Sequence, residues 1–115
     1  MCVENWSEHV VLVSLPGEPQ TADELTDVAR WIAGRADCDV VLDCSDVERM
    51  GQSCCRLLLE LSGALISRGH QLVLCGSRSA LKEKLATPAL AHLLRFADDR
   101  FTALARLELA HQQHC

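Results

Sequence analysis

The sequence predicts an α/β fold: a single domain with a small mixed β-sheet flanked by about four to five helices. Short apolar, β-branched runs alternate with amphipathic stretches along the chain, which favours strands covered by helices. The length of 115 residues suits one ordinary domain. With 49% apolar and 23% charged residues, such a chain can bury a core without metal or disulfide staples. We expect one domain over residues 1–115, with its core at about 10–109.

The strands are recognised as short apolar runs bounded by turn residues. Such runs cover residues 10–15, 39–44 and 71–75, and residues 2–7 are a candidate edge strand. Because the three runs are apolar almost throughout and are separated by helical stretches, we expect a parallel or mixed sheet.

The helices are recognised by apolar residues at three- and four-residue spacing and by capping signals. Thr21 and Glu24 fit a capping box at the start of the first helix, with Thr21 as the N-cap. Gly69 fits a C-cap at the end of the second helix. The expected helices cover residues 22–35, 53–68, 78–85, 89–94 and 101–109, and we expect the last residues, 110–115, to fray.

Charge and hydropathy narrow the classes of partner. The chain has 11 Lys and Arg against 16 Asp and Glu, a net charge of −5, which argues against nucleic acid as the main partner. No apolar run is long enough to span a bilayer, and the first residues do not resemble a signal peptide. We therefore expect a cytoplasmic protein.

The seven cysteines are odd in number and form no C-x-x-C motif. Several lie inside apolar runs, so we interpret most of them as reduced packing residues. His111, His114 and Cys115 carry side chains that suit zinc, but no second half of a site accompanies them. We expect neither a metal nor a cofactor.

Few motifs favour an enzyme. The sequence has no phosphate-binding glycine loop and no zinc-protease motif. Ser53, Cys54 and Cys55 have no histidine nearby in sequence, although a triad needs only proximity in space. A small enzyme or ligand-binding protein that uses residues 43–46 or the cysteine pair stays open as an alternative, and we expect no enzyme.

Ser53 is the main candidate site, because it lies at the predicted start of the second helix. A helix N-terminus has unpaired N–H groups and a partial positive charge, so the fold tolerates a phosphate there. The phosphate would still add a charge of about −1.5 to −2 to the surface. The alternative is that Ser53 only caps the helix.

Five segments follow one another in the order and at the distances of a known family. They are an opening strand ending in Gly-Glu (residues 11–18), a strand similar to Val-Leu-Asp-Leu-Ser-x-Val (40–47), a counterpart of hydrophobic-Asp-Ser-Ser-Gly (50–54), a counterpart of Arg-Gly-Gly-x-Leu-x-Leu-x-Gly (68–76) and a closing Leu-Phe and Ala-Leu segment (93–104). Over residues 10–109 the chain thereby resembles a STAS domain, the anti-sigma factor antagonist module of bacterial partner switching.

The resemblance implies a switch. The unmodified domain would bind an anti-sigma factor that is itself a serine kinase with a histidine-kinase-like ATPase fold. Phosphorylation of the serine that matches Ser53 would break the complex, and a serine phosphatase would reset it. The candidate partner-binding residues are Gln20, Asp43, Asp46, Gly51, Gln52 and Cys54.

The chain departs from the family pattern near this serine. Gly51 and Gln52 stand where the family has Asp and the first Ser, Cys54 replaces Gly, and Gln20 replaces an Asp near the first turn. The loss of two acidic positions favours an alternative. In that alternative the chain is an unphosphorylated scaffold subunit of a stressosome-like or lipid-transport complex.

Overall fold

The computed structural model describes residues 2–5, 10–17, 20–35, 38–48, 51–76, 81, 83, 85 and 94–113. Its elements are β1 (Cys2–Asn5), β2 (Val10–Ser14), α1 (Thr21–Arg35), β3 (Asp39–Asp43), α2 (Gln52–Ser67), β4 (Leu72–Cys75), β5 (Arg95–Ala97) and α5 (Arg100–Gln113). The five strands form one sheet in the order β1-β2-β3-β4-β5. β1 runs antiparallel to β2 and the other neighbours are parallel, so the expected mixed sheet is confirmed.

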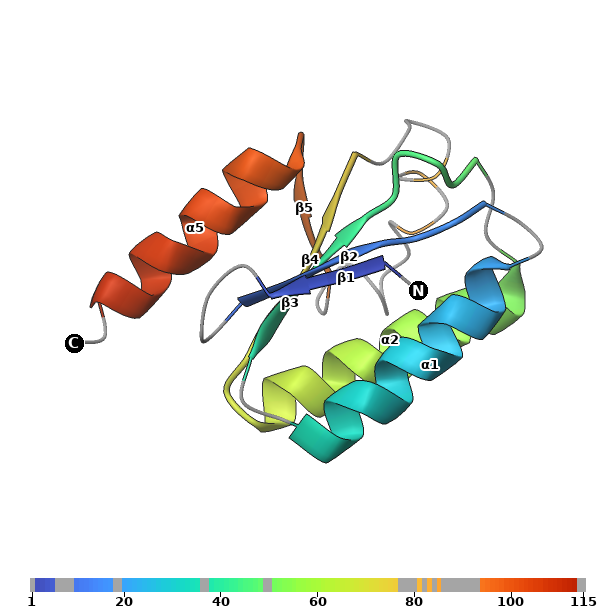
Figure 1. Ribbon diagram of the computed structural model, residues 1–115, viewed down its shortest axis with the longest axis horizontal. Coiled ribbons are helices and arrows are strands. Elements are labelled where there is room, and N and C mark those ends of the chain that lie inside the picture. Colours follow the sequence, from blue (N-terminus) through green and yellow to red (C-terminus); the bar gives the residue numbers. More distant parts are fainter. Residues whose placement is uncertain are drawn as a thin grey trace.

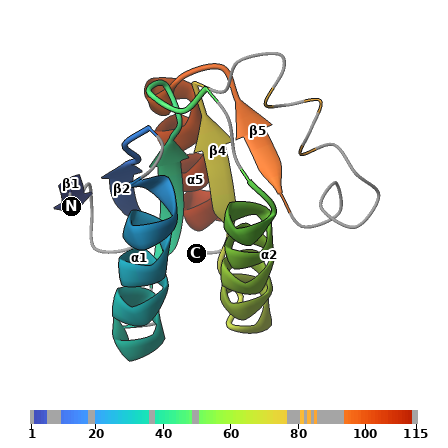
Figure 2. The same ribbon diagram turned by 90° about the vertical axis from the view of Figure 1, so that its right-hand side faces the viewer.

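The helices cover the two faces of the sheet. Figures 1 and 2 show α1 and α2 side by side on one face and α5 on the other. Side chains of a strand alternate between faces, so Val11 and Val13 of β2 join the core beneath α1 and α2. Val10 and Leu12 join the core beneath α5. Burial on both faces explains why these strands are apolar throughout.

The helix boundaries agree with the expected ones within a few residues at most ends. Thr21 is the first residue of α1 and not its N-cap, and its hydroxyl donates to the Pro16 carbonyl oxygen at 2.7 Å. At the end of α2, Gly69 has a φ of +80°, its N–H bonds to the Ile66 oxygen, and the His70 N–H bonds to the Leu65 oxygen. These two bonds make the Schellman motif, which confirms the expected stop.

Three expectations need correction. β5 is absent from the predicted strands, because it has three residues and its Arg95 is exposed, so no apolar run marks it. α5 continues to Gln113, so residues 110–113 are helical and not frayed. The described residues form three helices with defined bounds, against the expected four to five. The predicted helices 78–85 and 89–94 lie mostly outside the described residues.

The cysteines confirm their interpretation as packing residues where they are described. Cys38, Cys44, Cys54 and Cys75 are buried and Cys55 is half-buried, and none of these five described cysteines is in a disulfide. Among the described residues, no helix has the length and apolar character that crossing a membrane requires.

Candidate functional site: the C-terminal edge of the sheet

The candidate residues gather where the parallel strands β2 and β3 end. The loop after β2 leads into α1, and the loop after β3 leads into α2 (Figure 1). The two loops touch, because a Cβ on Gly17 would lie 2.9 Å from the Asp46 carbonyl oxygen. The loop that contains Gln20 therefore lies against the loop that contains Asp46. Ligands of open α/β sheets gather at this edge.

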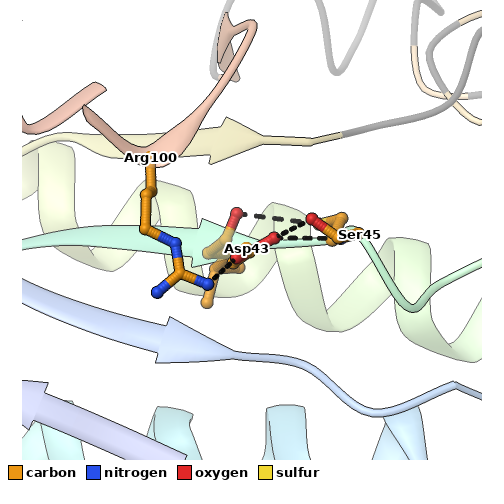
Figure 3. A network of polar contacts seen from close by, with 5 residues as sticks. Asp43, Ser45 and Arg100 are labelled. Atoms are coloured by element: carbon orange, nitrogen blue, oxygen red, sulfur yellow. Dashed lines mark hydrogen bonds and ion pairs between the residues drawn. The ribbon is translucent and has the colours of Figure 1, made fainter. Parts of the chain in front are cut away.

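The end of β3 is held by a network of Asp43, Ser45 and Arg100, which we call the anchor network (Figure 3). Oδ1 of Asp43 accepts hydrogen bonds from the Ser45 hydroxyl and from the Ser45 backbone N–H, the latter at 3.0 Å. Oδ2 of Asp43 accepts one from Nη2 of Arg100 at 2.6 Å. The network thus joins the start of α5 to the first residues of the β3–α2 loop.

These contacts set the charge state of Asp43. Burial acts to raise the pKa of this carboxyl, and the hydrogen bonds from Ser45 and Arg100, with the positive charge of Arg100, more than offset that effect. The pKa therefore lies below its ordinary value. Asp43 is ionised at neutral pH and paired, as a buried carboxylate needs to be.

Gly76 covers the anchor network from the end of β4. Its φ is +69°, and a Cβ there would lie 2.5 Å from Oγ of Ser45 and 3.1 Å from Oδ1 of Asp43. Both the left-handed backbone and the close approach require glycine at this position. The Gly76 N–H also donates to the Asp98 carbonyl oxygen at 3.3 Å, which ties β4 to the segment before α5.

Ser53 lies in the exposed first turn of α2. We call Gly51, Gln52 and Ser53, all three exposed, the presented turn. Gly51 is the N-cap, no side chain caps the helix, and no acidic residue lies in its first turn. The interpretation of Ser53 as the helix cap is therefore wrong. The first backbone N–H groups of an α-helix have no acceptor within the helix. The first turn of α2 therefore carries a partial positive charge, which favours a negatively charged group there.

The structure separates the remaining predicted site residues into two groups. Gln20 and Asp46 are exposed, as are Gly51 and Gln52 of the presented turn. Asp43 and Cys54 are buried, at 7% and 2% exposure. Both side chains are turned into the domain, and their role in partner binding stays a prediction. Cys54 packs in the core with Leu58, and the four-residue spacing between them was the signal for it.

Sequence reasoning missed Arg100 and Gly76. Arg100 is 57 residues from Asp43 in the chain, so no local pattern links them. Gly76 stood in a recognised segment, but only the fold shows that it covers Ser45. Among the described residues, no three His, Cys, Asp or Glu side chains gather as metal ligands do. His114 and Cys115, with the side chain of His111, lie outside the described part.

Solved structures of other proteins share the fold of this chain at low sequence identity. Curated protein sequences gave no match. A serine-to-glutamate variant of Moorella thermoacetica RsbS is 18% identical, with a TM-score of 0.76 over 96% of this chain and 97% of that one. The anti-sigma factor antagonist SpoIIAA in its unphosphorylated form is 13% identical, with a TM-score of 0.73 over 93% and 96%. A chain from the architecture of the stressosome is 19% identical, with a TM-score of 0.70 over 96% and 98%.

Sequence identities this low show only that the folds are similar. The family model is more specific, because the STAS domain model matches residues 8–103, which include the anchor network and the presented turn. The chain belongs to the STAS domain family.

Proposed function

We propose that this protein is an anti-sigma factor antagonist in the cytoplasm, and that it is a binding module and not an enzyme. In the proposal, the unmodified domain binds an anti-sigma factor serine kinase with a histidine-kinase-like ATPase fold. Phosphorylation of Ser53 releases that partner, and a serine phosphatase restores binding. The proposal rests on the family and on one observation: Ser53 is exposed in the first turn of α2.

The position of Ser53 suits a phosphate acceptor physically. A kinase can reach an exposed hydroxyl without unfolding the domain. The phosphate would meet the positive end of α2, which has no acidic residue in its first turn to repel it. It would also add about −1.5 to −2 charges to the presented turn. The fold would survive while the contact surface changes, which is what a reversible switch needs.

The surroundings supply a preformed contact surface. Asp46 and Gln20 are exposed on the two loops that touch at Gly17, next to the presented turn. The anchor network fixes the beginning of the β3–α2 loop from inside. A partner that docks here therefore meets a loop whose base is already ordered, which lowers the entropy cost of binding.

A scaffold without phosphorylation is the second candidate. Neutral Gly51 and Gln52 stand where the family has acidic and hydroxyl residues, so a kinase that reads those side chains would act poorly. The similarity to a stressosome chain is consistent with assembly into a larger complex. In a scaffold of this kind, or in a subunit of a lipid-transport complex, Ser53 would have no modification.

Co-purification from the source cell tests the proposal. The baits are the wild type, Ser53→Ala and Ser53→Glu, and the intact mass of each bait is measured. We expect the wild type and S53A to retain a kinase-like partner and S53E to lose it. We also expect part of the wild-type bait, and none of S53A, to be heavier by one phosphate.

Two matched variants control for charge and for loss of a hydroxyl. Ser67→Glu places the same charge at the other end of α2, and Ser67→Ala removes an exposed hydroxyl there. Both are expected to retain more partner than S53E. If all baits hold the same partners and none is phosphorylated, the switch is excluded and the scaffold is supported.

A further inference from the structure

A second site lies at the other end of the sheet. A pocket of about 360 Å³ is bordered by the beginnings of β4 and β5 and by the middle of α5. Val73, one of its lining residues, belongs to the core beneath α5, so the pocket lies on that face of the sheet. Ser53 lies after the end of β3, in the first turn of α2, which covers the opposite face (Figure 1). The pocket is therefore separate from the presented turn, and its ligand is independent of the proposed function.

The alternation of side chains along the strands determines which groups face the pocket. Leu94 and Phe96 pack in the core beneath α1 and α2. Arg95 lies between them, so its side chain projects to the α5 face of the sheet. Gln71 directly precedes β4 and shares the face of Val73 by the same alternation. The sheet therefore presents a guanidinium group and a side-chain amide to the pocket, and both residues line it.

A second guanidinium group comes from α5. Nη1 of Arg106 donates to the Phe96 carbonyl oxygen at 3.0 Å, which holds this exposed side chain beside β5. A guanidinium group has five N–H donors, so most of those on Arg106 are left for a ligand. Arg95 is exposed too, and in the described part of the chain no carboxylate forms an ion pair with either arginine. Val73 and Leu107 are only 3% and 1% exposed, so a ligand meets mainly the polar groups.

One carboxylate lies near this end of the sheet. Oδ1 of Asp39 accepts a hydrogen bond from the backbone N–H of Gln71 at 2.7 Å and lies 3.4 Å from Nδ1 of His70. Asp39 is 4% exposed, so this carboxylate is buried and already engaged, and it leaves the two exposed guanidinium groups uncompensated. Two such cations in a protein of net charge −5 make the pocket a local site for negative charge.

We propose that this pocket binds a phosphate group through Arg95, Arg106 and the side-chain amide of Gln71. A phosphate group carries about −1.5 to −2 charges at neutral pH, which balances two guanidinium groups, whereas a carboxylate balances one. The planar fork of arginine pairs with phosphate oxygens through two parallel hydrogen bonds. The pocket has room for about a dozen waters at roughly 30 Å³ each, so it accommodates either free phosphate or a small phosphorylated molecule.

Amide chemical shifts of the full chain test the proposal at constant ionic strength, with inorganic phosphate, glucose 6-phosphate, glucose and acetate as probes. We expect both phosphates to shift the amides of Gln71, Arg95 and Arg106, and glucose to shift none of them. Acetate should bind about tenfold more weakly, because it lacks the charge for a second guanidinium group. Tighter binding of glucose 6-phosphate than of inorganic phosphate would identify a phosphorylated small molecule as the ligand, and the reverse order would identify free phosphate.

Three variants assign the shifts to the pocket. Arg95→Gln and Arg106→Gln are each expected to weaken phosphate binding about tenfold. Arg56→Gln removes an equal charge from the exposed face of α2 and is expected to leave binding unchanged. Within the described residues the side chain of Arg95 forms no hydrogen bond or ion pair, so R95Q gives the answer even if R106Q is unfolded.

Several outcomes would overturn the proposal. Equal binding of glucose and glucose 6-phosphate would show that the arginines select nothing, and equal binding of acetate and phosphate would contradict the pairing with two cations. An equal loss of binding in R56Q and R95Q would mean that the surface attracts anions without a site. Shifts confined to the presented turn, or no shifts at all, would exclude the pocket.

Discussion

The two halves of the stretch from Asp43, at the end of β3, to Ser53, in the first turn of α2, differ in how firmly the fold holds them. In the first half, Asp43 and Val47 are buried, and the Val47 N–H donates to the Cys44 oxygen at 3.0 Å. In the presented turn, Gly51, Gln52 and Ser53 are exposed and no side chain caps the helix. One short segment therefore contains both a fixed base and an open surface, and substitutions in the two halves should have different consequences.

Gly76→Ala is expected to have the largest effect on stability, because Gly76 covers the anchor network. The new Cβ would collide with Ser45, and alanine is strained at a φ of +69°. We expect the free energy of unfolding to fall by about 3 kcal/mol. Chemical denaturation measures this. Gly63→Ala is the control, because a Cβ there meets nothing within 4 Å, and in mid-helix it should stabilise by about 0.5–1 kcal/mol. Equal stability of G76A and the wild type would contradict the packing described here.

Arg100→Met removes one partner of Asp43 and is expected to have a moderate effect. Breaking a fully buried pair costs about 3–5 kcal/mol. The Arg100 side chain is 39% exposed, so solvent screening reduces the expected loss to about 1–2 kcal/mol. Chemical denaturation of R100M measures this loss. Arg100→Lys is the comparison variant, because it keeps the positive charge and loses the planar guanidinium group. No loss in R100M would mean that Ser45 alone holds Asp43.

The same pair predicts a dependence on pH. The pKa of Asp43 is lower in the folded state, so the pair stabilises the fold above the ordinary carboxyl pKa. That contribution is lost as the pH falls through the lowered pKa. The stability difference between the wild type and R100M should therefore be constant near neutral pH and shrink below about pH 4. A difference that grows with acidity would contradict the assignment.

Ser53→Glu is expected to change stability little, because the presented turn is open. A negative charge in the first turn of a helix contributes about 0.3–1 kcal/mol. S53E should therefore be as stable as the wild type or slightly more so in low salt, while it loses the proposed partner. Thermal unfolding in low and high salt checks this. A clear loss of stability would mean that Ser53 belongs to the fixed half.

Cys54 and Cys55, neighbours in the first turn of α2, differ in how deeply they are buried. Cys54 is buried and Cys55 is half-buried. Burial and the charge of Asp43 also raise the pKa of the Cys75 thiol to about 12. With Cys2 and Cys115 replaced by serine, a thiol reagent should modify Cys55 first in the native protein. Cys54 and Cys75 should react only on unfolding. Equal native reactivity of the two vicinal cysteines would show that the first turn of α2 opens.

The sequence was informative wherever the signal was local. Apolar runs located β2, β3 and β4, and the stop at Gly69 is visible in the chain itself. β5 has too few residues and too little apolar character to be recognised, since its pairing with β4 supplies its stability. The Asp43–Arg100 pair joins distant residues, so only the folded chain reveals that Asp43 holds the start of α5 against the end of β3.

Control of partner binding by Ser53 on the presented turn can be tested on the natural protein without any substitution. The protein is isolated from its source cell in a partner-bound and a free pool, and tandem mass spectrometry measures the phosphate at Ser53 in each. We expect phosphate on Ser53 in the free pool and almost none in the bound pool. Equal phosphorylation of the two pools, or its absence from both, would contradict the proposed switch.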